Sequence, residues 1–126
     1  MTHWATTYIG DDWISGEHDC WGFARRVWRE QFGWDVPQVP SISLLADAKA
    51  LSSHPERHNW TGVVTPKEGD AVLMGFGHRP HHIGVWCDAD GGGVLHAVEG
   101  AGVIFQRPTA LATAGWNILT LHRRAA

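Results

Sequence analysis

The chain has 126 residues, of which 44% are hydrophobic and 18% are charged, and its net charge is −3 with histidine neutral. These values are typical of a globular protein with one core, so we expect a single domain over residues 1–126. They exclude a disordered chain, and the absence of a long basic run argues against a nucleic-acid partner. No apolar run approaches bilayer length, so we expect no insertion into a membrane.

The N-terminal residues and the cysteines bear on where the protein is made. Residues 1–7 lack the basic and apolar regions of a signal peptide. Two cysteines, Cys20 and Cys87, are too few for a disulfide framework. We therefore expect synthesis and folding in the cytoplasm without a signal peptide.

Helical patterns dominate the first half of the chain. A short helix is predicted over residues 3–9, and turn residues fill 10–19. An amphipathic helix is predicted over residues 20–32, capped by Asp19 and closed by Gly33. Its apolar positions recur with a period of 3.6 residues and are Cys20, Phe23, Ala24, Val27 and Trp28. A further helical stripe is predicted from about residue 41 to residue 53.

The second half of the chain changes to the alternation of strands. About five short strands are predicted, over residues 70–74, 81–87, 94–98, 103–106 and 117–122. Helices followed by hairpin-linked strands indicate an α+β fold with an antiparallel sheet.

Cys20 is a candidate nucleophile because of its position in the first turn of the predicted helix. Unpaired backbone N–H groups and the helix dipole favour the thiolate there. The alternative is a small buried hydrophobe, which is what most free cysteines are. The helix alone does not decide between the two interpretations.

Strand alternation predicts two histidines facing the same way. His82 and Gly84 share one face of the strand 81–87, and Cys87 lies on the other, so a disulfide with Cys20 is not expected. We expect the helix that begins at Cys20 to cover the His82 face, with Gly84 permitting a close approach. His96, one strand further on, is expected beside His82. A cysteine, a histidine and a third polar group are the parts that activate a thiol.

Three motifs resemble those of the NlpC family of papain-like cysteine peptidases, in the same order over roughly residues 4–123. They are Asp19-Cys20-Trp21-Gly22-Phe23, His82-Ile83-Gly84-Val85 and Leu95-His96-Ala97. More narrowly, three segments resemble the branch found in tail proteins of long-tailed bacteriophages: Gly10 to Cys20 with the following Trp, Glu68-Gly69-Asp70, and His96 to Gly100.

The resemblance implies a nucleophile helix packed on a small antiparallel sheet. It implies hydrolysis of peptidoglycan stem peptides, commonly between D-glutamate and the diamino acid. Carried over by position, Cys20 is the nucleophile, His82 the general base and acid, and His96 the orienting third member, with no cofactor. Asp19 matches the acidic residue that binds the free amine of the stem peptide, although a helix N-cap explains it equally well.

Trp13 departs from the family pattern, which has a tyrosine whose hydroxyl helps to position the site. An indole N–H donates but cannot accept. We nevertheless place Trp13 and Trp21 with Asp19 as substrate-binding residues. The resemblance also implies other tail-tip proteins as partners and a place in the virion tail.

Three alternatives stay open. His78, His81, His82 and His96 could bind zinc, although a solvated rim is the preferred interpretation of His78 and His81. The fold could serve as a structural tail-tip protein with an occluded or unused site, using exposed tryptophans as contact anchors, namely Trp13, Trp21, Trp34 or Trp60. A thiol amidase or acyltransferase would use the same nucleophile and base.

Overall fold

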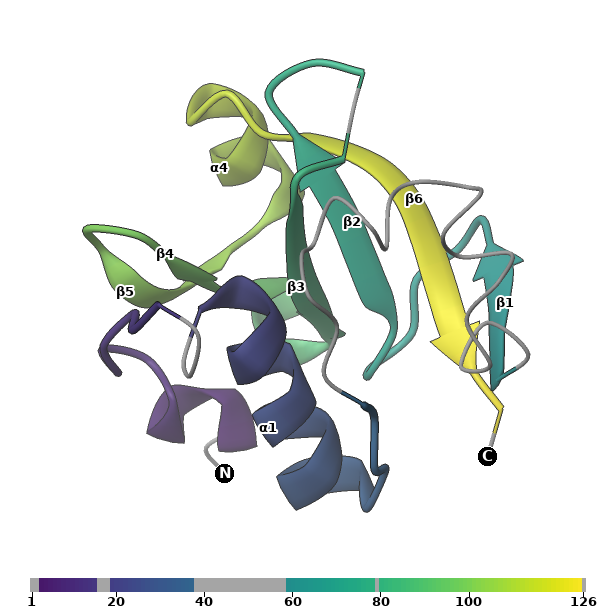
Figure 1. The fold of residues 1–126 in the computed structure, drawn as a ribbon. Coiled ribbons are helices and arrows are strands. Elements are labelled where there is room, and N and C mark those ends of the chain that lie inside the picture. The colour runs from purple at the N-terminus through teal and green to yellow at the C-terminus, as the bar shows by residue number, and fades with distance from the viewer. Residues whose placement is uncertain (1–2, 16–18, 38–58, 79, 126) are drawn as a thin grey trace.

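A computed structural model describes residues 3–15, 19–37, 59–78 and 80–125. Helix α1 (Cys20–Phe32) packs on a six-stranded antiparallel sheet of order β1-β6-β2-β3-β4-β5 (Figure 1). The strands are β1 (Trp60–Val63), β2 (Ala71–Gly75), β3 (His82–Cys87), β4 (Gly93–Val98), β5 (Gly102–Gln106) and β6 (Asn117–Arg124). Three short elements complete the described fold: η1 (Trp4–Thr7), η3 (Ala89–Gly91) and α4 (Pro108–Thr113). The predicted α+β class is confirmed.

Helix α1 begins and ends where its sequence signals place it. The Asp19 carboxylate accepts a hydrogen bond from the Gly22 backbone N–H at 2.8 Å. Gly33 closes the helix in the left-handed region, at φ 72°, which only glycine adopts without strain. The prediction of this helix is confirmed at both ends.

The sheet has one strand more than expected. Strand β1 is an edge strand of four residues that pairs with β6 from Trp60↔Arg124 to Val63↔Leu121. The sequence predicts no strand here, because the four residues follow a polar stretch and carry little alternation. Helix α4, which begins at Pro108, was also not predicted. The predicted helix over residues 41–53 lies outside the described residues.

Two cores lie on opposite faces of the sheet. On one face, Phe23, Ala24, Val27 and Trp28 of α1 pack in a cluster with strand residues that include Ile83, Val85, Cys87, Leu95 and Ala97. The other cluster contains Val72, Met74, Trp86, Val94, Leu111 and Trp116. The expectation that α1 covers the His82 face is therefore wrong, because the helix packs on the aliphatic face. Cys87 lies in the core with Ile83 and Val85, on the face away from His82, and this choice of face was predicted.

Gly84 serves a different neighbour from the one expected. A side chain at Gly84 would overlap Val94 and would approach His96 Cβ to 3.1 Å. The missing side chain thus lets β4 side chains, rather than α1, come close to β3.

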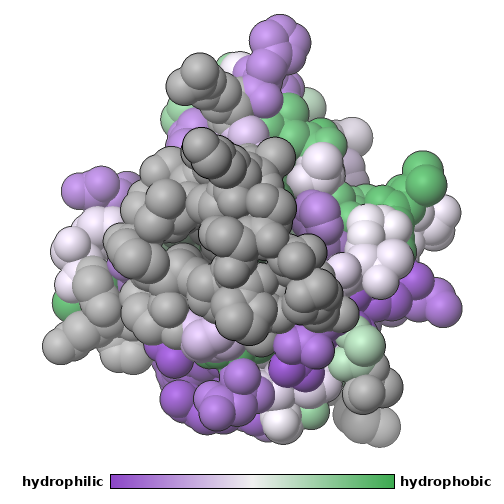
Figure 2. All heavy atoms as spheres, turned by 45° about the vertical axis from the view of Figure 1, so that its right-hand side comes forward, coloured by the Kyte–Doolittle hydropathy of each residue, from purple (hydrophilic) through white to green (hydrophobic). Residues whose placement is uncertain are grey.

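The tryptophans proposed as contact anchors pack inward. Trp13, Trp34 and Trp60 are partly buried against the α1 core, and Trp21 is buried within it. The described large apolar residues on the surface are instead Ile9, Ile14, Val64, Phe76 and Ile118. Figure 2 shows hydrophobic and hydrophilic residues interspersed over the visible described surface, with hydrophilic residues gathered along its lower edge. Burial removes Trp21 as an exposed contact anchor, whereas the anchor role of the half-buried Trp13, Trp34 and Trp60 stays a prediction.

A half-buried ion pair joins the last strand to the turn before β2. Asp70 is 2% exposed and accepts hydrogen bonds from Arg123 Nε at 3.0 Å and Nη2 at 2.8 Å. In the same turn, the Trp28 indole N–H donates to the Gly69 carbonyl at 2.9 Å. These contacts fix α1, β2 and β6 relative to one another. No helix among the described residues is long and apolar enough to cross a membrane.

Candidate active site

Two buried histidines meet on the face of the sheet opposite α1. His82 begins β3 and His96 lies in β4, and the structure joins His82 Nε2 to His96 Nδ1 at 2.8 Å. His82 is 7% exposed and His96 is fully buried. Burial lowers the pKa of His82 to about 3, helped by the neighbouring His96 and His81. It lowers the pKa of His96 to about 4, so both rings are neutral at pH 7.

The pair is extended by a residue that the sequence did not single out. His96 Nε2 lies 2.9 Å from Gln106 Oε1, at the end of β5. Paired positions Val94↔Gln106 and His96↔Ile104 put Gln106 diagonally across from His96 on the same face. Pairing the two predicted strands of the hairpin 94–106 and applying strand alternation could have identified Gln106 from the sequence.

Trp116 covers the histidine pair. Its ring stacks on His82 with centroids 4.5 Å apart and meets His96 edge-on at 5.9 Å. Phe76 stacks on the other side of Trp116 at 4.2 Å. Trp116 is 9% exposed whereas Phe76 is 61% exposed, so Trp116 is the inner ring of this stack and lies directly against the imidazoles.

The environment of Cys20 differs from the expected one. Burial is the largest influence on its thiol and raises the pKa, and the Asp19 carboxylate raises it further. Backbone hydrogen bonds to the sulfur lower the pKa, and the largest of these effects comes from the Ile83 amide. They do not outweigh burial. The prediction that the helix start favours a resting thiolate is therefore wrong, because desolvation of the charged sulfur dominates.

The contact with the Ile83 amide places the Cys20 sulfur beside the start of β3. Ile83 is the residue that follows His82 in this strand. The His82 ring itself lies on the Trp116 side of the sheet. The site thus joins a neutral thiol, at the beginning of a helix, to the strand that carries a neutral, hydrogen-bonded imidazole. A thiol and an imidazole in these protonation states form a thioester when the thiol proton passes to the imidazole during attack.

The remaining predicted site residues have structural contacts. Asp19 is the N-cap of α1. Trp21 is 5% exposed and packs edge-to-face on Trp28 with centroids 5.7 Å apart. Its ring belongs to the core, so its assignment to the substrate surface is wrong. Trp13 is half-buried against the same core.

A comparison with family models gives a match over residues 5–122, to the NlpC/P60 family. The chain belongs to the NlpC/P60 family. This family consists generally of cysteine peptidases and amidases that act on peptidoglycan. No curated protein matches the chain.

In this NlpC/P60 domain the histidines considered as zinc ligands separate into two kinds. His78 and His81 are exposed, and His81 Nε2 accepts a hydrogen bond from the Phe76 backbone N–H at 3.2 Å. His82 and His96 are buried and bonded to each other. Within the described ranges, no three His, Cys, Asp or Glu residues are grouped as metal ligands.

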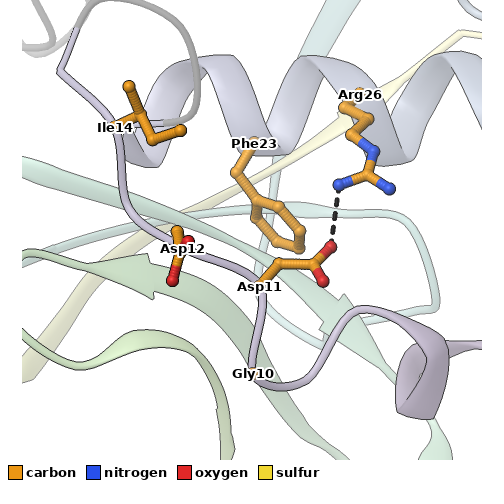
Figure 3. A pocket seen from close by; sticks show the side chains of 6 residues that line it. All are labelled: Gly10, Asp11, Asp12, Ile14, Phe23 and Arg26. Carbon is orange, nitrogen blue, oxygen red and sulfur yellow. Dashed lines mark hydrogen bonds and ion pairs between the residues drawn. The ribbon is translucent and has the colours of Figure 1, made fainter.

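A cavity of about 400 Å³ opens beside α1, away from the histidine pair. It lies between the segment that precedes the helix and the helix itself, and Arg26 crosses it to Asp11 at 2.8 Å (Figure 3). Its lining residues are Gly10, Asp11, Asp12, Ile14, Phe23 and Arg26. None of them is Cys20, His82 or His96.

Proposed function

We propose that this NlpC/P60 protein hydrolyses an amide bond of a peptidoglycan stem peptide by thiol catalysis. Cys20 is the nucleophile, His82 the general base and acid, and His96 the group that orients His82. The observation that carries the proposal is the buried hydrogen bond between His82, at the start of β3, and His96 in β4. The next residue of β3, Ile83, contacts the Cys20 thiol through its backbone amide.

The first half of the reaction forms a thioester. Cys20 and His82 are both neutral at rest, so the thiol proton passes to His82 as sulfur attacks the carbonyl carbon. The Cys20 backbone N–H, at the positive end of α1, stabilises the oxyanion of the tetrahedral intermediate. The His82 imidazolium then donates its proton to the leaving amine, and the carbon–nitrogen bond breaks.

The second half regenerates the enzyme. Water attacks the thioester carbonyl and gives a proton to neutral His82. The carbon–sulfur bond breaks, His82 returns the proton to the departing sulfur, and a free carboxylic acid leaves. His82 is neutral at the start of each half because burial lowers its pKa to about 3, and the same lowered pKa makes the imidazolium formed in each half a strong acid that readily gives up its proton.

We further propose cleavage between D-glutamate and the diamino acid, with Asp19 near the free amine of the stem peptide. The support is the match of Asp19-Cys20 to the family motif. Its carboxylate already caps α1, so any contact with the amine is additional.

Digestion of purified muropeptides, with products identified by mass spectrometry, tests the proposal. We expect two peptide fragments cut after D-glutamate, with undiminished rate in excess chelator and loss of activity after thiol alkylation. Release of the whole stem peptide from the sugar would indicate an amidase. Transfer of the acyl group to an added amine would indicate an acyltransferase. Activity that survives alkylation but not chelation would overturn the thiol mechanism.

We also propose that the protein is made in the cytoplasm and acts at a phage tail tip with other tail proteins. The support is the sequence resemblance of Gly10 to Cys20, Glu68-Gly69-Asp70 and His96 to Gly100 to the tail-protein branch. Detection of the chain in purified tail particles, by peptide mass spectrometry, tests the location. Equal hydrolysis rates for particles and isolated protein would exclude a purely structural role, and hydrolysis by neither would support it.

A further inference from the structure

We propose that Gln106 is a positioning residue that fixes the proton of His82 through His96. The inference rests on the proposed function, since it concerns how the base is prepared for the thiol. It starts from two distances on one face of the sheet: Gln106 Oε1 to His96 Nε2 at 2.9 Å, and His96 Nδ1 to His82 Nε2 at 2.8 Å.

The direction of the two hydrogen bonds follows from the amide oxygen. An amide oxygen only accepts, so the proton of neutral His96 lies on Nε2. His96 Nδ1 is then an acceptor, and the bond to His82 requires the proton of His82 on Nε2. The lone pair of His82 is thereby placed on Nδ1, the only ring nitrogen left to receive the thiol proton.

The opposite orientation of the Gln106 amide would reverse the direction of both hydrogen bonds. An amide NH₂ donating to His96 would move that proton to Nδ1, which would donate to His82 Nε2. His82 would then carry its proton on Nδ1 and could not act as a base there. Because both rings are buried, water cannot readily substitute for the missing acceptor. The Gln106 oxygen therefore selects the productive tautomer.

The backbone holds Gln106 firmly in this place. Positions 94 and 106 are paired in the β4–β5 ladder, and Val94 is fully buried. The neighbouring Gly93 lies so close that a Cβ there would be 2.8 Å from the Gln106 carbonyl oxygen. The Cα of Gln106 is thus held in place, two residues along β5 from Ile104, which is paired with His96.

The test is the tautomer of each histidine, read from long-range proton–nitrogen correlations of ¹⁵N-histidine-labelled protein at pH 7. In the wild type we expect His82 and His96 both protonated on Nε2. Gln106→Leu removes the acceptor, so we expect His96 and His82 to become mixtures of tautomers. Gln106→Glu supplies another acceptor oxygen and should restore the wild-type pattern. Ile104→Val, which alters packing beside His96 without touching Nε2, is the matched control.

Muropeptide hydrolysis gives the second readout. We expect Gln106→Leu to lower kcat about tenfold or more with KM unchanged, and Gln106→Glu to recover most of the loss. A wild-type His82 protonated on Nδ1 would overturn the inference, and so would unchanged tautomers in Gln106→Leu. If Gln106→Leu does not fold, the wild-type and Gln106→Glu spectra still decide. The tautomers are measured without substrate, so a failure of hydrolysis would count against the proposed function alone.

Discussion

At the scale of single residues, His82 combines an internal hydrogen bond with an aromatic cover. Its depressed pKa comes first from burial, and Trp116 is the ring stacked directly on it. Phe76 lies one layer further out and is mostly exposed. We therefore expect Trp116 to contribute more to the burial that lowers the His82 pKa than Phe76 does.

The two aromatic residues provide a matched pair of variants. We expect the acid limb of the kcat/KM profile to lie well below the ordinary histidine pKa of about 6.5 in the wild type. Trp116→Ala admits water to His82 and should move that limb upward by roughly one pH unit or more, at a stability cost of about 3 kcal/mol. Phe76→Ala should leave the limb in place. Equal shifts in both variants would contradict the shielding role of Trp116.

Part of the site was predictable from the sequence. Cys20, His82 and His96 lie in short motifs, and strand alternation in β3, together with the expected pairing of the next strand, led to the expectation that His96 lies beside His82. Gln106 and Trp116 were missed because each reaches the pair from another element, across the β4–β5 hairpin or from the turn before β6. Burial of the Cys20 thiol, which reverses the expected sign of its pKa shift, depends on tertiary packing that a helix position does not reveal.

At the scale of elements, α1 places Cys20 through its cap. Asp19 holds the Gly22 N–H and also raises the pKa of the neighbouring thiol. The two roles, structural and electrostatic, reside in one carboxylate, and a third role in binding a substrate amine is part of the proposed function.

An isosteric variant separates these roles. Asn is as good an N-cap as Asp, so Asp19→Asn should change the free energy of unfolding by less than about 0.5 kcal/mol. Removal of the charge should lower the Cys20 pKa, measured by the pH dependence of alkylation. If Asp19 binds an amine, KM should rise; an unchanged KM would contradict that part of the proposal. Asp19→Ala, which removes the cap, should cost about 1 kcal/mol.

Two features of the sheet were not predicted correctly from the sequence: the face that α1 covers and the edge strand β1. Alternation in β3 correctly separated His82 from Cys87, but it did not say which face α1 would cover. Both faces are buried in β3, so neither is marked by exposed polar residues. The apolar stripe of α1 packs on the aliphatic side, and Trp116 with α4 residue Leu111 fills the other. Strand β1 was missed because a four-residue edge strand carries little alternation.

At the scale of the whole molecule, the buried histidine pair couples stability to pH. The folded pKa values, about 3 for His82 and about 4 for His96, lie below the unfolded value of about 6.5. Above pH 6.5 neither state binds these protons. As pH falls below 6.5, the unfolded state binds protons that the folded state does not, so folding loses stability.

We therefore expect the free energy of unfolding to fall by on the order of a few kcal/mol between pH 7 and pH 4.5, measured by urea denaturation. His82→Gln should reduce this fall because one of the two coupled groups is gone. His78→Gln, at an exposed histidine, should leave it unchanged. A wild-type free energy that is constant over this range would contradict the neutral, buried state of the pair.

The central claim is that Cys20 is the nucleophile, and the two cysteines allow a direct comparison. Both are free thiols, but Cys87 is fully buried in the α1 core and burial raises its pKa to about 12. The measurement is the rate of muropeptide hydrolysis by Cys20→Ala and by Cys87→Ala, each shown to be folded. We predict a loss of at least about 10³-fold for Cys20→Ala and near wild-type turnover for Cys87→Ala. Substantial hydrolysis by folded Cys20→Ala would contradict the account.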